Sequence, residues 1–362
     1  MRASVAIGVL LALLLSAGAC LAAQSPWQAV WESESAANKL SLVGEARTMA
    51  LMDGQTLSAT AAVSAARGKV RFDYTRDRHR WSLIDDGKNL IPLDPRDKAA
   101  TVLKRPALAV DKVLAEQNYA AAEAGTAEVA GRPTRIIEVA PKGGGAIVYR
   151  LWLDRENGFA LKQERYNVEG QLASSTEYTK VEFGVSVAPG VFEVPAGWRV
   201  ERKVEAEERL SPAQLSERLG FVVKTPRSIP RGYVLLGGYV QQWGRHERLT
   251  AELRYTDGLR VLSVYQRVRG EDEGPAEHGR HRSRRHGGRG RGDGGEEGRG
   301  RGREDERGRG GGHGFGPPGD QEMTLVNRGA EKALRYFGPR AVVVVVGDLE
   351  LEELMAIARS VE

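Results

Sequence analysis

The sequence has almost no cysteine and, after its N-terminal segment, no long apolar run. These two shortages exclude a disulfide-stabilised fold and a membrane-spanning helix. Among its 362 residues there is one cysteine, Cys20. A single cysteine cannot form an internal disulfide, so burial of apolar side chains has to stabilise the fold. After the first 23 residues no apolar run reaches the roughly 18 to 20 residues that a membrane-spanning helix needs. We therefore expect the mature chain to be soluble or tethered only by a lipid.

The N-terminus has the layout of a secretory signal peptide, which we assign to residues 1–23. Arg2 precedes an apolar run from Val5 to Leu15, and small residues follow up to Ala23. Cys20 ends this segment within a partial lipobox, although Ala17 stands where a lipobox usually has Leu. Two outcomes stay open: Cys20 is acylated and becomes the mature N-terminus, or it is removed with the peptide. Either outcome predicts an exported protein, periplasmic or tethered in the cell envelope.

The length of the remaining chain and the 41% hydrophobic content of the full sequence predict two domains. The first, residues 24–194, reads as consecutive antiparallel strands joined by polar turns, with one helix from Leu108 to Tyr119. A strand from Ile147 to Asp154, for example, alternates and ends in a turn containing Gly158. We predict an α+β fold, with an open antiparallel half-barrel and a packed helix.

A charged stretch, residues 195–210, is predicted to be a linker to a smaller α+β domain, residues 211–362. Ser211, Pro212 and Gln214 form a helix-start signal, and Gly220 stops the helix. The Asp257-Gly258 pair predicts a hairpin between two of the strands that follow. A last strand precedes a C-terminal helix, which we expect Asp348 to cap.

Residues 271–320 interrupt the second domain with a segment of different composition. It holds 11 Arg, 11 Asp plus Glu, many glycines and almost no apolar side chains. Such a segment is predicted to be a disordered loop. Its Arg-Gly steps are typical of RNA-binding segments, but the charges cancel and only Phe315 is aromatic. With an export signal present, we predict no nucleic-acid partner; the net charge of +5 favours an anionic membrane surface instead.

No catalytic constellation is present, so the sequence predicts a binding protein and not an enzyme. Only His79 and His246 lie outside the insertion, and neither belongs to a recognised catalytic or metal motif. The carboxylates Asp85, Asp86 and Asp94 lie in turns, where Asp is common for conformational reasons. We predict no catalytic, metal or cofactor site.

An open sheet that one helix only partly covers is expected to leave an apolar groove for an acyl chain or a hydrophobic peptide. We selected five candidate lining residues by their position in alternating strands: Trp81, Leu90, Leu103, Tyr149 and Leu151. The alternative, that all five belong to an ordinary core, is favoured by the usual location of such side chains.

Three stretches in order resemble the MucB/RseB regulators of the periplasm, whose first domain is similar to the lipoprotein carrier LolA. The first runs from Val129 to Asp154 and contains Arg150-Leu151-Trp152-Leu153-Asp154, similar to the family's "RxWLD" strand. The second, from Tyr255 to Tyr265, is similar to its "YSDGL…SVF" hairpin. The third, Ala341 to Asp348, is similar to its terminal "VTVVGE" strand.

The resemblance implies a LolA-like sheet, a smaller C-terminal domain and a role in an envelope stress response. In that role the protein binds the periplasmic segment of an anti-sigma factor and releases it when lipid or misfolded envelope protein occupies the groove; a lipid or an acylated protein is a possible further partner. Two other classes stay open: a lipoprotein or lipid carrier of LolA type, and a structural envelope lipoprotein for which Cys20 would be the main functional residue.

Overall fold

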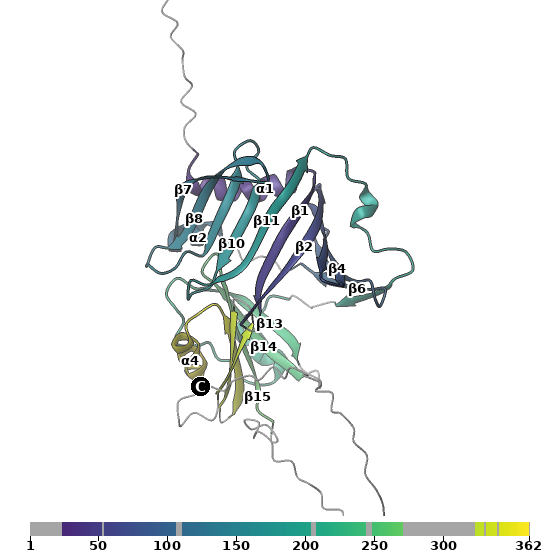
Figure 1. Cartoon of the computed structure of the whole chain (residues 1–362). Coiled ribbons are helices and arrows are strands. Elements are labelled where there is room, and N and C mark those ends of the chain that lie inside the picture. Colours follow the sequence, from purple (N-terminus) through teal and green to yellow (C-terminus); the bar gives the residue numbers. More distant parts are fainter. Residues whose placement is uncertain are drawn as a thin grey trace, which may run out of the picture.

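Two β-sheets follow one another along the chain in the computed structural model, with the smaller sheet below the larger one in Figure 1. The structure describes residues 24–52, 54–105, 111–203, 208–243, 248–270, 323–328, 331–338 and 340–361. The predicted signal peptide with Cys20 and the predicted insertion at 271–320 lie outside the described residues.

The first sheet has twelve strands, and eleven of them form two antiparallel meanders, β1–β6 and β7–β11, which meet in the middle of the sheet where β1 pairs with β11. The order across the sheet is β12-β6-β5-β4-β3-β2-β1-β11-β10-β9-β8-β7. The strands are β1 (Leu42–Met52), β2 (Gln55–Ala66), β3 (Lys69–Arg76), β4 (His79–Asp85), β5 (Asn89–Asp94), β6 (Ala99–Lys104), β7 (Tyr119–Val129), β8 (Arg132–Pro141), β9 (Tyr149–Asp154), β10 (Ala160–Tyr166), β11 (Leu172–Phe183) and β12 (Arg199–Lys203).

A helix that the sequence analysis did not predict, α1 (Pro26–Lys39), packs on one face of this sheet. Ser25 caps it by accepting a hydrogen bond from the Gln28 amide, and proline occupies its first turn. In Figure 1 the helix runs behind the strands, and its buried Ala29 joins a core cluster with strands β8 and β9. We call this side of the first sheet the α1 face.

The predicted helix from Leu108 to Tyr119 is shorter in the structure. Helix α2 (Lys112–Asn118) starts after Asp111, whose side chain accepts from the Leu114 amide, and Tyr119 already begins β7. Residues 106–110 lie outside the described residues. The helix ends at Asn118 because the backbone of Tyr119 is extended.

The predicted linker, 195–210, contains β12, which pairs in parallel with β6 at the edge of the first sheet. A 3₁₀ turn, η1 (Pro189–Phe192), precedes it, and Phe192 joins a core cluster with Ile84, Ile91 and Leu93 on the face opposite α1. The chain thus returns to the first sheet before it enters the second domain.

The second sheet has six strands in the order β13-β14-β15-β18-β17-β16 and two helices. Its elements are α3 (Pro212–Leu219), β13 (Val234–Trp243), β14 (Arg248–Thr256), β15 (Val261–Val268), β16 (Met323–Arg328), β17 (Glu331–Phe337), β18 (Ala341–Gly347) and α4 (Leu351–Ser360). The α+β architecture predicted from the sequence, with an open antiparallel sheet and a smaller second domain, is confirmed. The domain limits themselves stay a prediction.

Both helices of the second domain cover the same face of its sheet. Leu215 of α3 and Leu354 and Ile357 of α4 are fully buried there against strand residues such as Leu253 and Val345. The predicted helix start is present in α3, where Ser211 and Gln214 form a capping box and Gly220 is left-handed at the end. This face is a closed apolar core.

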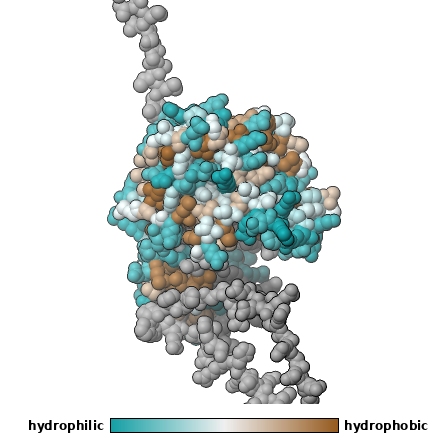
Figure 2. Space-filling model, viewed as in Figure 1, coloured by the Kyte–Doolittle hydropathy of each residue, from teal (hydrophilic) through white to brown (hydrophobic). Residues whose placement is uncertain are grey.

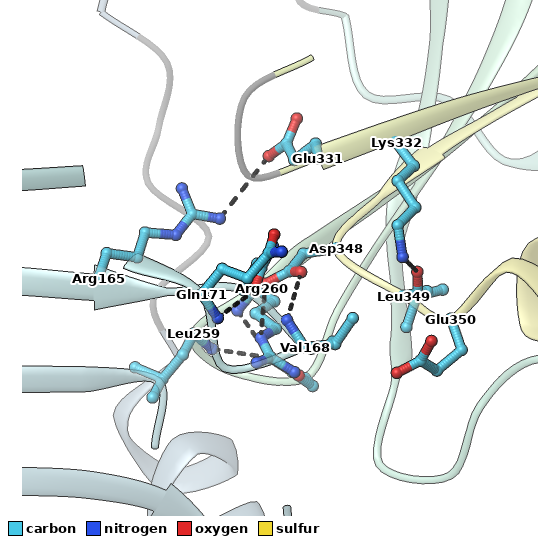
Figure 3. A network of polar contacts seen from close by, with 12 residues as sticks. Arg165, Val168, Gln171, Leu259, Arg260, Glu331, Lys332, Asp348, Leu349 and Glu350 are labelled. Atoms are coloured by element: carbon cyan, nitrogen blue, oxygen red, sulfur yellow. Dashed lines mark hydrogen bonds and ion pairs between the residues drawn. The ribbon is translucent and has the colours of Figure 1, made fainter. Parts of the chain in front are cut away.

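The prediction that Asp348 caps the last helix is wrong. Glu350 and Glu353 form that capping box, and the Asp348 side chain turns to the junction between the domains. One of its oxygens accepts from the Val168 amide at 2.9 Å, and the other lies 3.3 Å from Arg260 Nε (Figure 3). Burial raises the pKa of this carboxyl above its usual value, although the Arg260 charge acts in the opposite direction. A buried ion pair therefore stands at the junction.

Further polar contacts hold the turn between β10 and β11 against the second domain. Arg165 lies 3.9 Å from Glu331, and Lys332 donates to the Leu349 carbonyl at 3.0 Å (Figure 3). Lys332 also contacts Glu169. The junction therefore joins one end of the first sheet to strands β17 and β18. Within the described ranges, no helix has both the length and the apolar character needed to cross a membrane.

Candidate functional site

All five predicted groove residues lie on the α1 face of the first sheet. Side chains of directly paired residues share a face, so the strand register traces the face from one end to the other. On one side of the sheet Leu103 pairs with Leu90, and Trp81 pairs with Tyr74. The trace continues through the following pairs: Leu90–Asp85, Tyr74–Ala61, Ala61–Ala46, Ala46–Tyr178, Thr176–Gln163, Gln163–Leu151 and Val139–Tyr149.

A groove of about 470 Å³ lies on this face beside α1. This volume is within the range of small-molecule and acyl-chain sites. Helix α1 supplies one wall, and strands from both halves of the sheet supply the floor. Its apolar lining residues are Trp27, Val30, Trp31, Ala37, Ala65, Val70, Phe72, Val139, Tyr149, Leu151, Phe159, Ala160, Tyr178 and Leu259.

The groove brings together two of the five predicted residues. Tyr149 and Leu151 line it directly, and Leu151 is buried against α1. Trp81 borders a second hollow of about 680 Å³ that also has polar walls such as Arg47. Leu90 and Leu103 pair with each other farther along the same face, half-buried. Whether any of the five binds lipid stays a prediction.

An aromatic ladder continues the α1 face from the groove toward Trp81. The rings of Phe72 and Tyr74 are stacked at 5.7 Å, and those of Tyr74 and Trp81 at 5.1 Å. Phe72 lines the groove, so Trp81 belongs to an extension of its apolar surface. On the opposite face of the sheet, which Figure 2 views from outside, hydrophilic side chains interrupt the apolar ones.

The groove residues of α1 were missed because that helix was not predicted. Trp27 and Trp31 stack at 4.9 Å, one helical turn apart, and the Trp31 indole donates to Glu116 of α2 at 2.8 Å. The signal was present in the sequence: a Ser25-Pro26 start is followed by apolar residues at helical spacing. The two tryptophans place aromatic area over the groove.

The groove carries little charge. Burial raises the pKa of Tyr149 and of Tyr178, which both line the groove, so their hydroxyls stay neutral at physiological pH. The charged residues in its lining are Glu34 of α1 and Arg105, and Arg105 lies 3.4 Å from Asp85. A largely apolar surface with two charged residues of opposite sign suits an apolar chain.

The predicted turn carboxylates hold turns. Asp85 accepts from the Gly87 amide at 2.9 Å, Asp86 from the Lys88 amide at 2.8 Å, and Asp94 from the Arg96 amide at 2.9 Å. Their role is therefore conformational, as predicted. His79 is exposed at a strand start beside Arg96, and His246 lies outside the described residues.

The chemistry of the groove favours binding. Ser33 and Thr176 place hydroxyl groups in the groove, but a hydroxyl needs a base such as histidine to act as a nucleophile. The groove-lining residues that the structure describes include no histidine. Across the described ranges, no three His, Cys, Asp or Glu side chains gather in a way that could hold a metal ion. A non-enzymatic role stays a prediction from these residues.

Comparisons with known proteins agree with this picture. Residues 39–196 match the model of the MucB/RseB N-terminal domain. The sigma factor AlgU regulatory protein MucB of Pseudomonas aeruginosa is 28% identical over 141 residues, which is 39% of this chain and 42% of that protein. The alignment thus spans less than half of the curated relative's length.

Two solved structures share the fold over most of the chain. One is a chain of the Pseudomonas aeruginosa MucA/MucB complex, with 17% identity, a TM-score of 0.58 and coverage of 92% of this chain and 96% of that chain. The other, MucB in complex with MucA(peri), has 18% identity, a TM-score of 0.57 and the same coverage. The two-sheet fold is therefore shared with MucB, and residues 39–196 of this chain match the MucB/RseB N-terminal domain family.

Proposed function

We propose that this protein is a non-enzymatic sensor of the cell envelope that binds the periplasmic segment of an anti-sigma factor and a hydrophobic ligand. The observation that carries the proposal is the apolar groove beside α1, in a two-sheet fold shared with a protein crystallised with MucA(peri). The predicted signal peptide supports an envelope location for this activity.

The ligand side of the proposal rests on the lining of the groove. Aromatic and aliphatic side chains from α1, β3 and β9 converge on it, and the hydroxyls of its lining residues Tyr149 and Tyr178 stay neutral. A lipid, or the acyl chain of a lipoprotein, matches that chemistry because burying apolar surface stabilises the complex by roughly 25 cal/mol per Å². The regulatory side rests on the name of the curated relative, a sigma factor regulatory protein.

The first test is native mass spectrometry of the mature protein, with organic extraction of whatever co-purifies. Phe72 is half-buried in the groove, so Phe72→Asp should abolish bound acyl lipid. Ser58→Asp is the matched control, because Ser58 is exposed on the other face of neighbouring β2 and is in the lining of neither hollow. A folded, empty protein that takes up no added lipid would contradict the groove function.

Binding of the partner is tested separately. The mature protein is titrated by calorimetry with the purified periplasmic segment of the single-span anti-sigma protein of the same organism. We expect a one-to-one complex that weakens when acyl lipid is added. Lipid binding without a complex would indicate a carrier, and neither activity would indicate a structural lipoprotein.

A further inference from the structure

A loop of the second domain forms part of the groove in the first. Leu259 lies in the loop between β14 and β15, residues 257–260, and is the one described groove-lining residue that belongs to the second domain. Like Trp27 and Tyr149, which also line the groove, it packs against a cluster whose buried members include Tyr119 and Val139. The other domain therefore contributes a side chain to the wall of the groove.

Polar contacts fix this loop against the first domain. Asp257 accepts backbone hydrogen bonds from Leu259 at 3.0 Å and from Arg260 at 2.7 Å, and its other oxygen accepts from the buried Tyr119 hydroxyl. The Asn118 side chain donates to the Asp257 carbonyl at 2.8 Å and to the Gly232 carbonyl at 2.9 Å. The position of Leu259 thus depends on the end of α2 and the start of β7.

The approach of the two backbones leaves no space for a side chain. Gly258 has φ +103, and a Cβ there would lie 2.3 Å from the Ala115 nitrogen of α2. The Gly258 carbonyl also accepts from the Asp111 amide at 3.2 Å. A loop held this closely cannot move away from the groove without breaking the contacts that join the domains.

We infer that the groove is a single ligand site shared by both domains, in which an apolar chain contacts Leu259 and so stabilises the docked position of the second domain. This inference rests on the proposed groove function. The groove volume of about 470 Å³ exists with Leu259 in place, so a chain can enter without displacing it. Because linkage is reciprocal, loosening the domain contact must weaken ligand binding by the same factor that the ligand strengthens the contact.

The test uses a variant that loosens the loop without touching the groove lining. Tyr119→Phe removes only the hydroxyl that donates to Asp257, and Tyr119 is outside the lining. The control Tyr166→Phe removes the hydroxyl that donates to Glu164 within the first sheet, away from the loop. Binding of 11-(dansylamino)undecanoic acid is followed by fluorescence in the full mature chain, with circular dichroism to show that each variant is folded.

We expect Tyr119→Phe to weaken probe binding about fivefold or more, the lower end of typical coupling between sites, with the control unchanged. Equal affinity, tighter binding, or the same loss in the control would overturn the inference. Failure of the unaltered protein to bind the probe would instead contradict the groove function itself.

Hydrogen exchange supplies a readout that does not depend on the variant folding well. In the unaltered chain the probe should slow exchange of the Leu259 and Arg260 amides, which donate to Asp257 and hold the loop. It should do so even though Arg260 does not line the groove. Protection confined to α1 and β9, with the loop unchanged, would overturn the shared site.

Discussion

The two sheets of this molecule use their helices differently. In the second domain six strands carry two helices on one face, and the strand residues beneath them are fully buried. In the first domain twelve strands carry α1 over part of one face, and the aromatic ladder beyond it is half-buried. The covered face is suited to stability, whereas the partly covered face keeps apolar surface for a ligand.

The largest effect should come from opening the closed core. Leu354 of α4 is fully buried, so Leu354→Ala should lower the free energy of unfolding by about 2 to 5 kcal/mol. Leu103→Ala, on the open α1 face, should cost about 1 kcal/mol or less because the side chain is only half-buried. Urea denaturation of both variants measures the difference, and equal losses would mean that the two faces are equally closed.

A smaller effect is expected where the two regions meet. Gly258→Ala forces a Cβ against α2 at a positive φ and should cost about 1 to 3 kcal/mol. Calorimetry should also show the two domains unfolding separately. The matched control is Gly158→Ala, which has φ +74 but nothing within 4 Å of the added Cβ. A control that separates the domains as well would contradict the role of the close approach.

The next comparison uses pH. Burial raises the pKa of Tyr255 and of Tyr265 in the second sheet to about 12. The folded state therefore keeps both phenols protonated at a pH where the unfolded chain, with a pKa near 10, ionises them. The resulting stabilisation is complete below pH 10 and is lost as the pH rises toward 12. Tyrosinate absorbance near 295 nm should rise later in the native protein than in denaturant; coincident curves would contradict the burial.

The smallest effect belongs to the surface. Arg218 and Glu208 lie 2.8 Å apart, but their side chains are 57% and 60% exposed. Glu208→Gln should change the free energy of unfolding by at most about 0.5 kcal/mol, because solvent screens such pairs. A loss above 1 kcal/mol in urea denaturation would show that this helix end is less solvated than its exposure indicates.

Local chemistry explains what the sequence could predict, and long-range contacts explain what it could not. The start of α3 follows from Ser211 and Gln214, because the side chain of each accepts a hydrogen bond from the backbone amide of the other within one turn. The prediction that Asp348 caps a helix used the same local reasoning but was wrong. The Asp348 carboxylate instead accepts a hydrogen bond from the amide of Val168, which is 180 residues away in the sequence.

The candidate site divides in the same way. Alternation along each strand was enough to select five residues that share one face of the sheet. Alternation could not show that α1 covers Leu151 and leaves Trp81 uncovered, because that depends on where the helix crosses the sheet. The contribution of Leu259 from another domain left no local signal at all.

The return of the chain to the first sheet through β12 has a practical consequence for dissecting the protein. Strand β12 pairs with β6 and becomes the new edge of the sheet, and because it is short and mostly charged (Arg199, Glu201, Arg202, Lys203) it discourages the edge-to-edge pairing that leads to aggregation. A first-domain fragment cut at the end of the family match, residue 196, would lack this strand. A fragment that continues through Lys203 should stay monomeric at concentrations where the shorter one associates.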